Sequence, residues 1–243
     1  GVDWIQYSGP FFNEKEYIAG VESLLNGWFI LGENGRKLER LFAPKLGKSD
    51  GILVNSGSSA NLLMVSLLRT KRGGNLPKGS KFITPVVCFP TTINPLIQNG
   101  FEPVFVDVDQ FTHNIDVNKI EAAISPKTKA IMLAHSLGNP FNLDVVMDLY
   151  KKYNLWLVED CCDALGSTYR GQMVGTFGDI ATLSFYPAHH ITMGEGGAVF
   201  TKHDELKAIA ESFRDWGRDC YCPPGKDNTC SKRFCWKLGN LPQ

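Results

Sequence analysis

The sequence contains no long apolar run. No segment approaches the roughly 18 consecutive apolar residues that a membrane-spanning helix needs. The first residues, 1–6, show no basic stretch followed by an apolar one, so no signal peptide is visible. We therefore expect a cytoplasmic protein without a membrane segment. The chain begins without Met and ends abruptly at 240–243, from which we expect a truncated chain.

A net charge is also lacking. Lys and Arg together number 25, as do Asp and Glu, and the isoelectric point is near 7.1. No basic run marks a face for a polyanion. The charges are those of a mixed, solvated surface, and we expect no nucleic-acid partner.

Cysteines are too few and too clustered for a secreted disulfide scaffold. In a cytosolic protein such clustering favours metal ligation or redox chemistry over disulfides. The seven positions are Cys88, Cys161, Cys162, Cys220, Cys222, Cys230 and Cys235.

Short apolar runs alternate with segments of helical periodicity along most of the chain. In residues 60–68, for example, Ala60, Leu63, Met64 and Leu67 fall on one helix face. The alternation predicts an α/β fold, a three-layer α/β/α domain with a mostly parallel, seven-stranded sheet. We expect strands over 51–54, 81–84, 103–107, 130–134, 155–159, 181–185 and 198–201, and helices over 60–68, 91–99, 118–124, 143–153 and 205–213.

Residues 1–216 are predicted to form this domain, and residues 217–243 a cysteine-rich ordered loop. Parallel sheets bind ligands at the carboxyl ends of their strands. Polar residues at three predicted strand ends are therefore candidates for a ligand site.

Three segments suggest a phosphate-anchored aromatic cofactor. Ser58 and Ser59 open a predicted helix after Gly57, where backbone N–H groups and the helix dipole favour phosphate. Asp160 closes an apolar strand, where a carboxylate can pair with a pyridinium nitrogen. Phe89 is placed to stack on a ring. Taken singly, each is explained about as well by helix capping, a surface carboxylate or core packing.

The most informative segment is 184–197. Ser184 ends a strand, and a basic side chain follows five residues later, an arrangement typical of a phosphate-anchored aldehyde cofactor tethered by lysine. Here that residue is His189. Histidine cannot form a Schiff base, but it can move a proton near neutral pH. The exchange favours elimination over transamination.

Together these residues resemble the DegT/DnrJ/EryC1/StrS family of sugar aminotransferases, enzymes of the pyridoxal-phosphate fold type I. The resemblance implies that Ser58, Ser59 and Ser184 hold phosphate, that Phe89 stacks on the ring and that Asp160 meets the ring nitrogen. It places Asp163 near the ring hydroxyl. The matching segments, in the expected order over most of the chain, are 55–60, 84–94, 105–108, 159–160 with Ala164 and Gly166, 178–179, 184–187 and 194–201.

Within that family a histidine at the lysine position marks the sugar 3-dehydratases. These use pyridoxamine 5′-phosphate (PMP) bound without a covalent link. The resemblance thus implies PMP as cofactor and His189 as the catalytic base. It also implies a smaller C-terminal domain beyond this chain, and a homodimer with active sites at the interface.

Four cysteines form a second pattern. Cys220, Cys222 and Cys230 have the spacing C-x-C-x7-C, and 57 residues separate Cys162 from Cys220. If residues 160–162 are extended, Asp160 and Cys162 point to the same side. By spacing alone, a [2Fe–2S] cluster and a structural zinc are nearly equal readings, and inert cysteines rank third.

The same pattern resembles the iron–sulfur branch of the family, the CDP-4-keto-6-deoxyglucose 3-dehydrases of lipopolysaccharide biosynthesis. This resemblance favours a [2Fe–2S] cluster on Cys162, Cys220, Cys222 and Cys230. It implies a CDP-4-keto-6-deoxyhexose substrate, removal by His189 of a proton from the cofactor's C4′ carbon, and loss of the C3 hydroxyl. Electrons would come through the cluster from a separate flavin and iron–sulfur reductase.

Three alternatives remain open. A cluster-free dehydratase like the GDP-4-keto-6-deoxymannose enzyme would carry the histidine but has no use for the four cysteines. A non-catalytic, zinc-stabilised interaction domain would explain the cysteines without catalysis. An ordinary transaminase ranks third, because nothing obvious replaces the missing lysine.

Overall fold

Seven strands form the central sheet of the computed structural model, which describes residues 4, 8–27, 29–218, 222, 230–231, 237–238 and 241–242. They occur in the spatial order β1-β9-β8-β5-β4-β2-β3. Their bounds are β1 Asp50–Val54, β2 Lys81–Pro85, β3 Glu102–Val106, β4 Thr128–Ala134, β5 Trp156–Asp160, β8 Ile180–Ser184 and β9 Gly197–Thr201. All seven predicted strands are confirmed, with ends shifted by no more than a few residues.

The sheet is mostly parallel, as predicted. Strands β8, β5, β4, β2 and β3 run parallel to one another, whereas β9 runs antiparallel to both β1 and β8. The chain passes from β8 to β9 through residues 185–196 without a crossover helix, so β9 returns antiparallel. Consequently β1, β5 and β8 all end at the same edge of the sheet.

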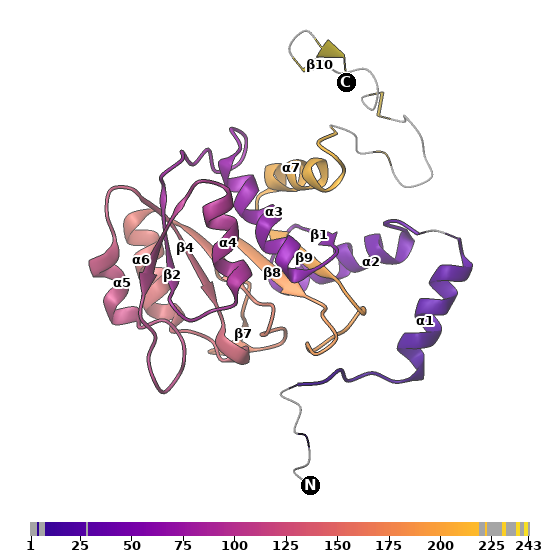
Figure 1. The fold of residues 1–243 in the computed structure, drawn as a ribbon, viewed down its shortest axis with the longest axis horizontal. Coiled ribbons are helices and arrows are strands. Elements are labelled where there is room, and N and C mark those ends of the chain that lie inside the picture. The colour runs from indigo at the N-terminus through magenta and orange to yellow at the C-terminus, as the bar shows by residue number, and fades with distance from the viewer. Residues whose placement is uncertain are drawn as a thin grey trace.

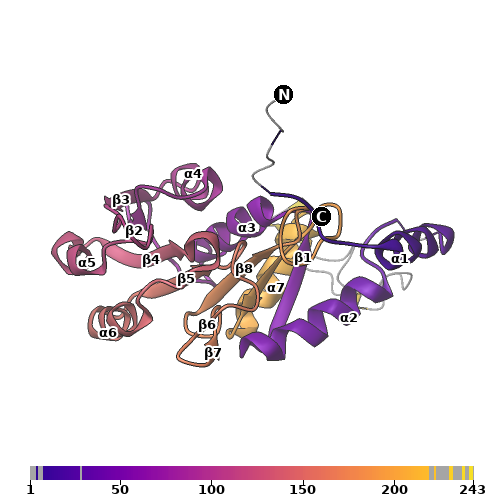
Figure 2. The ribbon, with the colours of Figure 1, turned by 90° about the horizontal axis from the view of Figure 1, so that it is seen from below.

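Helices cover both faces of the sheet, giving three layers (Figure 2). The helices α3, α4 and α7 lie on one face, and α2, α5 and α6 on the other. Their bounds are α2 Glu33–Phe42, α3 Gly57–Arg69, α4 Pro90–Gln98, α5 Val117–Ala123, α6 Leu143–Tyr153 and α7 Asp204–Arg214. The five predicted helices correspond to α3–α7.

The core divides into two clusters, one on each face. In β4, Ile131 and Leu133 face the cluster under α2, α5 and α6, and Ala130 and Met132 face the cluster under α3, α4 and α7. Successive side chains of a strand point to opposite faces, so a strand covered on both sides is apolar throughout. The predicted face of α3 is likewise buried.

Two N-terminal helices were not predicted. Helix α1, Glu14–Leu25, has no buried residue and lies away from the sheet (Figure 1). It begins with a capping box in which Asn13 N–H donates to Glu16 Oε2 at 2.7 Å. Short elements complete the fold: η1 Ala43–Leu46, η2 Ser136–Gly138, β6 Thr168–Tyr169, β7 Gln172–Met173, β10 Lys237–Leu238 and β11 Leu241–Pro242.

The C-terminal cysteine-rich segment is described only at a few positions. Cys222 and Cys230 are described, whereas Cys220 and Cys235 lie outside the described residues. The division of the chain at residue 216 therefore stays a prediction. Of the helices in the described ranges, none combines the length and the apolar character needed to cross a bilayer.

Candidate cofactor and metal site

The candidate site lies where three strands end. Val54 of β1 and Ser184 of β8 both pair with Gly197, the first residue of β9. Asp160, at the end of β5, pairs with Thr182 of β8. The sheet register thus brings Asp160 and Ser184 to the same edge as the end of β1, which lies more than a hundred residues earlier in the chain.

The N-terminus of α3 forms a concave backbone surface beside these strand ends. Ser56 caps the helix, and its hydroxyl oxygen accepts from Ser59 N at 3.1 Å. The Ser58 hydroxyl donates to Thr91 Oγ1 at 3.2 Å. A Cβ atom at Gly197 would collide with the backbone of Ser56 and Gly57. Glycine at position 197 therefore lets β9 approach the helix terminus, where N–H groups favour an anion.

Ser184 and Cys162 line the other side of this surface. A Cβ built on Gly57 would lie 2.6 Å from Ser184 Cβ and 2.8 Å from Cys162 Sγ. Ser184 Oγ also accepts from Tyr186 N at 3.3 Å. The hydroxyls of Ser58, Ser59 and Ser184 therefore belong to one cradle built around a glycine, which fits a phosphate group.

Asp160 is buried and surrounded by hydrogen-bond donors. Its Oδ2 accepts from Asn61 Nδ2 at 2.9 Å and from Thr92 Oγ1 at 2.8 Å. Its Oδ1 accepts from Cys162 N at 3.1 Å. In the described part of the chain no basic side chain forms an ion pair with Asp160. A carboxylate held this way fits a protonated ring nitrogen as its missing cationic partner.

Phe89 lies at the N-cap of α4 and is 66% exposed. Its ring is therefore not packed in the core, which was the alternative interpretation of Phe89 from the sequence. Cys88, beside it, is half-buried. Burial first, and then the nearby Asp160 carboxylate, raise the pKa of the Cys88 thiol to about 11. Cys88 is thus a neutral thiol beside the site.

His189 lies in the turn after β8 and contacts Asp163. Its Nε2 is 3.0 Å from Asp163 Oδ1, while its buried Nδ1 has no hydrogen-bond partner among the described residues. The Tyr186 and His189 ring centroids are 5.5 Å apart. Asp163 is exposed and reaches the candidate base, a contact that the sequence did not predict. His190 is exposed.

The structure describes three of the four predicted metal ligands, Cys162, Cys222 and Cys230. Cys222 Sγ and Cys230 Sγ lie 3.2 Å apart, and Cys230 N donates to Cys222 Sγ at 3.4 Å. Cys162 lies in the turn after β5, so the condition of an extended segment is not met, and its Sγ lies beside Gly57 at the start of α3. Burial, reinforced by Asp160, raises the pKa of the Cys162 thiol well above its usual value. Binding a metal there would require displacement of the thiol proton.

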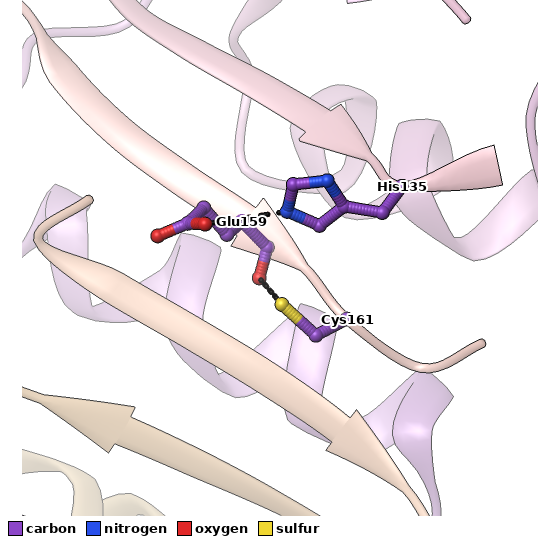
Figure 3. Close-up of side chains that lie close together, drawn as sticks. All are labelled: His135, Glu159 and Cys161. Carbon is purple, nitrogen blue, oxygen red and sulfur yellow. Dashed lines mark hydrogen bonds and ion pairs between the residues drawn. The ribbon is translucent and has the colours of Figure 1, made fainter. Parts of the chain in front are cut away.

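A second polar cluster lies on the opposite face of the sheet (Figure 3). His135 Nε2 is 3.2 Å from Glu159 Oε2, and Cys161 Sγ is 3.7 Å from the Glu159 carbonyl oxygen. Both Glu159 oxygens also accept backbone N–H groups, from Gly175 at 2.7 Å and Gly178 at 2.6 Å. The three side chains are close enough together to be considered as metal ligands. Because the protein itself satisfies the carboxylate, we interpret the cluster as a structural one.

The chain is similar to several nucleotide-sugar enzymes. Residues 12–236 match the model of the DegT/DnrJ/EryC1/StrS aminotransferase family. The Salmonella typhimurium lipopolysaccharide biosynthesis protein RfbH is 58% identical over 245 residues, covering 100% of this chain and 56% of the relative. The dTDP-4-dehydro-2,6-dideoxy-D-glucose 3-dehydratase of Saccharopolyspora spinosa is 54% identical over 240 residues, covering 98% of this chain and 52% of the relative.

A solved structure agrees with this relationship. The E. coli GDP-4-keto-6-deoxy-D-mannose-3-dehydratase with bound hydrated PLP (pyridoxal 5′-phosphate) superposes with a TM-score of 0.87 at 34% identity. The match covers 96% of this chain and 62% of that one. The chain spans about half the length of the curated relatives it matches.

Proposed function

Because this chain belongs to the DegT/DnrJ/EryC1/StrS aminotransferase family, we propose that it carries the cofactor site of a PMP-dependent 3-dehydratase. The substrate would be a nucleotide-linked 4-keto-6-deoxyhexose. One observation carries the proposal: His189, and not a lysine, follows Ser184 at the edge of the sheet, where it contacts Asp163 at 3.0 Å. A histidine there can move a proton but cannot anchor the cofactor covalently.

The described residues fit PMP. The cradle of Ser58, Ser59 and Ser184 would hold the phosphate, Asp160 the ring nitrogen, and the exposed Phe89 would stack on the ring. When bound, PMP supplies a primary amine for the sugar ketone and an aromatic ring that accepts electrons. Asp163 is proposed to lie near the ring hydroxyl as well as against His189.

The proposed role of His189 is that of a general base. As a neutral imidazole it would take the proton from the cofactor's C4′ carbon and give it to the departing C3 hydroxyl of the sugar, which would leave as water. A ring nitrogen of His189 with a free lone pair is required to accept this proton. The contact with Asp163 holds the side chain in place.

We further propose that Cys162, Cys220, Cys222 and Cys230 bind a [2Fe–2S] cluster. The 3.2 Å approach of the Cys222 and Cys230 sulfurs supports a shared inorganic group. Among the described residues Cys162 is not grouped within ligand distance of Cys222 and Cys230, so its place in the set rests on the resemblance to the iron–sulfur branch of the family. A separate flavin and iron–sulfur reductase would supply two electrons, one at a time, for net removal of the C3 oxygen. We expect a homodimer.

For the nucleotide we propose CDP, because the four-cysteine pattern together with His189 resembles the iron–sulfur branch of the family, whose substrate is CDP-linked. The related 3-dehydratases named above act on dTDP-linked and GDP-linked sugars. Competition of CDP, dTDP and GDP for the sugar site would distinguish these cases. The cluster-free dehydratase is the second candidate, favoured by the solved GDP-sugar enzyme with its TM-score of 0.87.

Exchange of the PMP C4′ proton with solvent tests the assignment of His189. We expect His189→Asn to lower the substrate-dependent exchange rate by about 100-fold or more, the usual contribution of a general base. The matched control is His190→Asn, because His190 is exposed and adjacent. Its exchange rate should stay near that of the unmodified chain. Full exchange in His189→Asn would refute the proposal.

The cluster has a separate test. Cys220→Ser should leave dehydration intact but stop net deoxygenation, because only the electron supply is interrupted. Product analysis with the reductase present separates the two steps. Net deoxygenation by this variant would show that the cluster is not needed.

A further inference from the structure

The carboxylate of Asp160 is tied down at one oxygen far more firmly than at the other. Oδ2 accepts two side-chain hydrogen bonds, from Asn61 Nδ2 at 2.9 Å and Thr92 Oγ1 at 2.8 Å. Among the described residues, Oδ1 accepts the backbone N–H of Cys162 at 3.1 Å, and the Cys162 thiol also bonds to the carboxylate. The two side-chain bonds therefore decide how the carboxyl plane is turned.

Asn61 is itself oriented by a third side chain. The Thr182 hydroxyl donates to Asn61 Oδ1 at 2.8 Å. An ionised carboxylate can only accept hydrogen bonds. The Asn61 amide must therefore present nitrogen to Asp160 and oxygen to Thr182, and each end has the partner that this orientation requires.

Burial makes this chain of bonds costly to break. Asn61 is 1% exposed, and Thr92 and Thr182 are 0% exposed. Asn61 lies in the middle of α3, where the neighbouring buried side chains are apolar. A buried amide in that position destabilises a helix unless its polar atoms are satisfied. Among the described residues, Asp160 and Thr182 supply these hydrogen bonds.

We propose that Asn61, held by Thr182, is a positioning residue that turns the Oδ1 atom of Asp160 toward the cofactor ring nitrogen. Thr92 supports the same oxygen from α4. This inference rests on the proposed function, because it assumes a pyridine nitrogen opposite Asp160. It also gives α3 two tasks: its first turn forms the phosphate cradle, and Asn61 aims the carboxylate, so one rigid helix sets the spacing of both cofactor anchors.

Cofactor binding gives the first test, with PMP carrying ¹⁵N in its ring. We expect Asn61→Leu, which keeps the branched shape of the side chain but removes both hydrogen bonds, to weaken PMP binding at least about tenfold. The ¹⁵N signal should move toward that of the unprotonated ring. Asn114→Leu is the matched control, since Asn114 is also buried and bonds Asn139 and Ser136. It should leave both readouts unchanged.

Cofactor-free protein gives the second test. The Asn61 side-chain N–H₂ protons should exchange slowly with deuterium, slowly still in Thr182→Ser, and rapidly in Thr182→Val. Two results would overturn the inference. One is that Asn61→Leu keeps the PMP affinity and ¹⁵N signal of the unmodified chain. The other is that the Asn61 N–H₂ protons exchange rapidly in the unmodified chain. Failure of the unmodified chain to bind PMP, with the slow exchange intact, would instead refute the proposed function and leave the Thr182–Asn61–Asp160 geometry standing.

Discussion

At the scale of single residues, Gly197 controls how closely β9 approaches the phosphate cradle. Any Cβ there would meet the Ser56 carbonyl and the Gly57 amide, both backbone atoms that cannot rotate away. Gly197→Ala should therefore destabilise the fold by about 1–3 kcal/mol and weaken phosphate binding. Thermal unfolding, with and without inorganic phosphate, measures both effects.

Gly20 is the matched control. It lies within α1, and a Cβ there has no atom within 4 Å. Gly20→Ala should be neutral or stabilise by about 0.5–1 kcal/mol, because alanine loses less backbone entropy in a helix. Equal destabilisation by the two substitutions would show that the crowding at Gly197 is not the cause.

The buried Glu159 predicts a pH dependence of stability. Burial alone would raise the pKa of Glu159, but the hydrogen bonds from His135, Gly178 and Gly175 outweigh it and hold the pKa below its usual 4.5. A depressed folded-state pKa stabilises the protein above pH 4.5, and this contribution is lost as the pH falls through the lowered value.

Glu159→Gln should accordingly cost about 1.5–3 kcal/mol at neutral pH. The difference from the unmodified chain should shrink in acid. Urea unfolding across the range from pH 7 into the acid region measures it, with Glu102→Gln, at an exposed position on β3, as the control. A deficit that stays constant with pH would contradict this account.

At the scale of secondary-structure elements, the start of α3 depends on its cap. The Ser56 hydroxyl accepts from Ser59 N and also donates to Ser59 Oγ at 3.2 Å. Ser56→Ala should lower the free energy of unfolding by about 1 kcal/mol. Within the same helix, half-buried Ser66 bonds back to the Leu62 carbonyl and accepts from Asn99 Nδ2 at 3.3 Å, so Ser66→Ala should cost less than the loss of the cap. Chemical denaturation compares the two, and an equal loss in both would rule out the capping role.

The helices and strands predicted most accurately were those that are buried against the core. The middle of β4, from residue 130 to 133, is apolar on both faces, and helix α3 shows a clear 3.6-residue period. Helix α1 was missed although its capping box, Asn13 and Glu16, is visible in the sequence. Its side chains are buried nowhere in the described structure, so no core pattern marks it. The two-residue strands β6 and β7 are too short to leave a pattern.

The candidate site residues that could be predicted are polar residues at the ends of strands. Residues that reach the site through contacts with distant parts of the sequence could not be predicted. Ser184 and Asp160 were found because each ends an apolar strand. Asn61, Thr92 and Thr182 were missed, because Asn61 is 99 residues from Asp160 and 121 from Thr182. Only the sheet register and the packing of α3 bring them together. An asparagine on the buried face of a helix was the one available signal.

At the scale of the whole molecule, balanced charge predicts a solubility minimum near neutral pH. The formal net charge is zero, and large apolar side chains such as Phe11 and Leu25 are 95% and 81% exposed. Without net repulsion such surfaces associate. Light scattering between pH 5 and 9 should show the strongest association near pH 7, and a minimum of association there would contradict this expectation.

The visible spectrum of anaerobically purified protein, with iron and sulfide assays before and after dithionite, tests the central claim most directly. We expect a pyridoxamine-type band together with broad iron–sulfur absorption that bleaches on reduction, and equal amounts of iron and sulfide. Zinc in place of iron, with no cofactor band, would contradict the claim and favour a structural zinc domain.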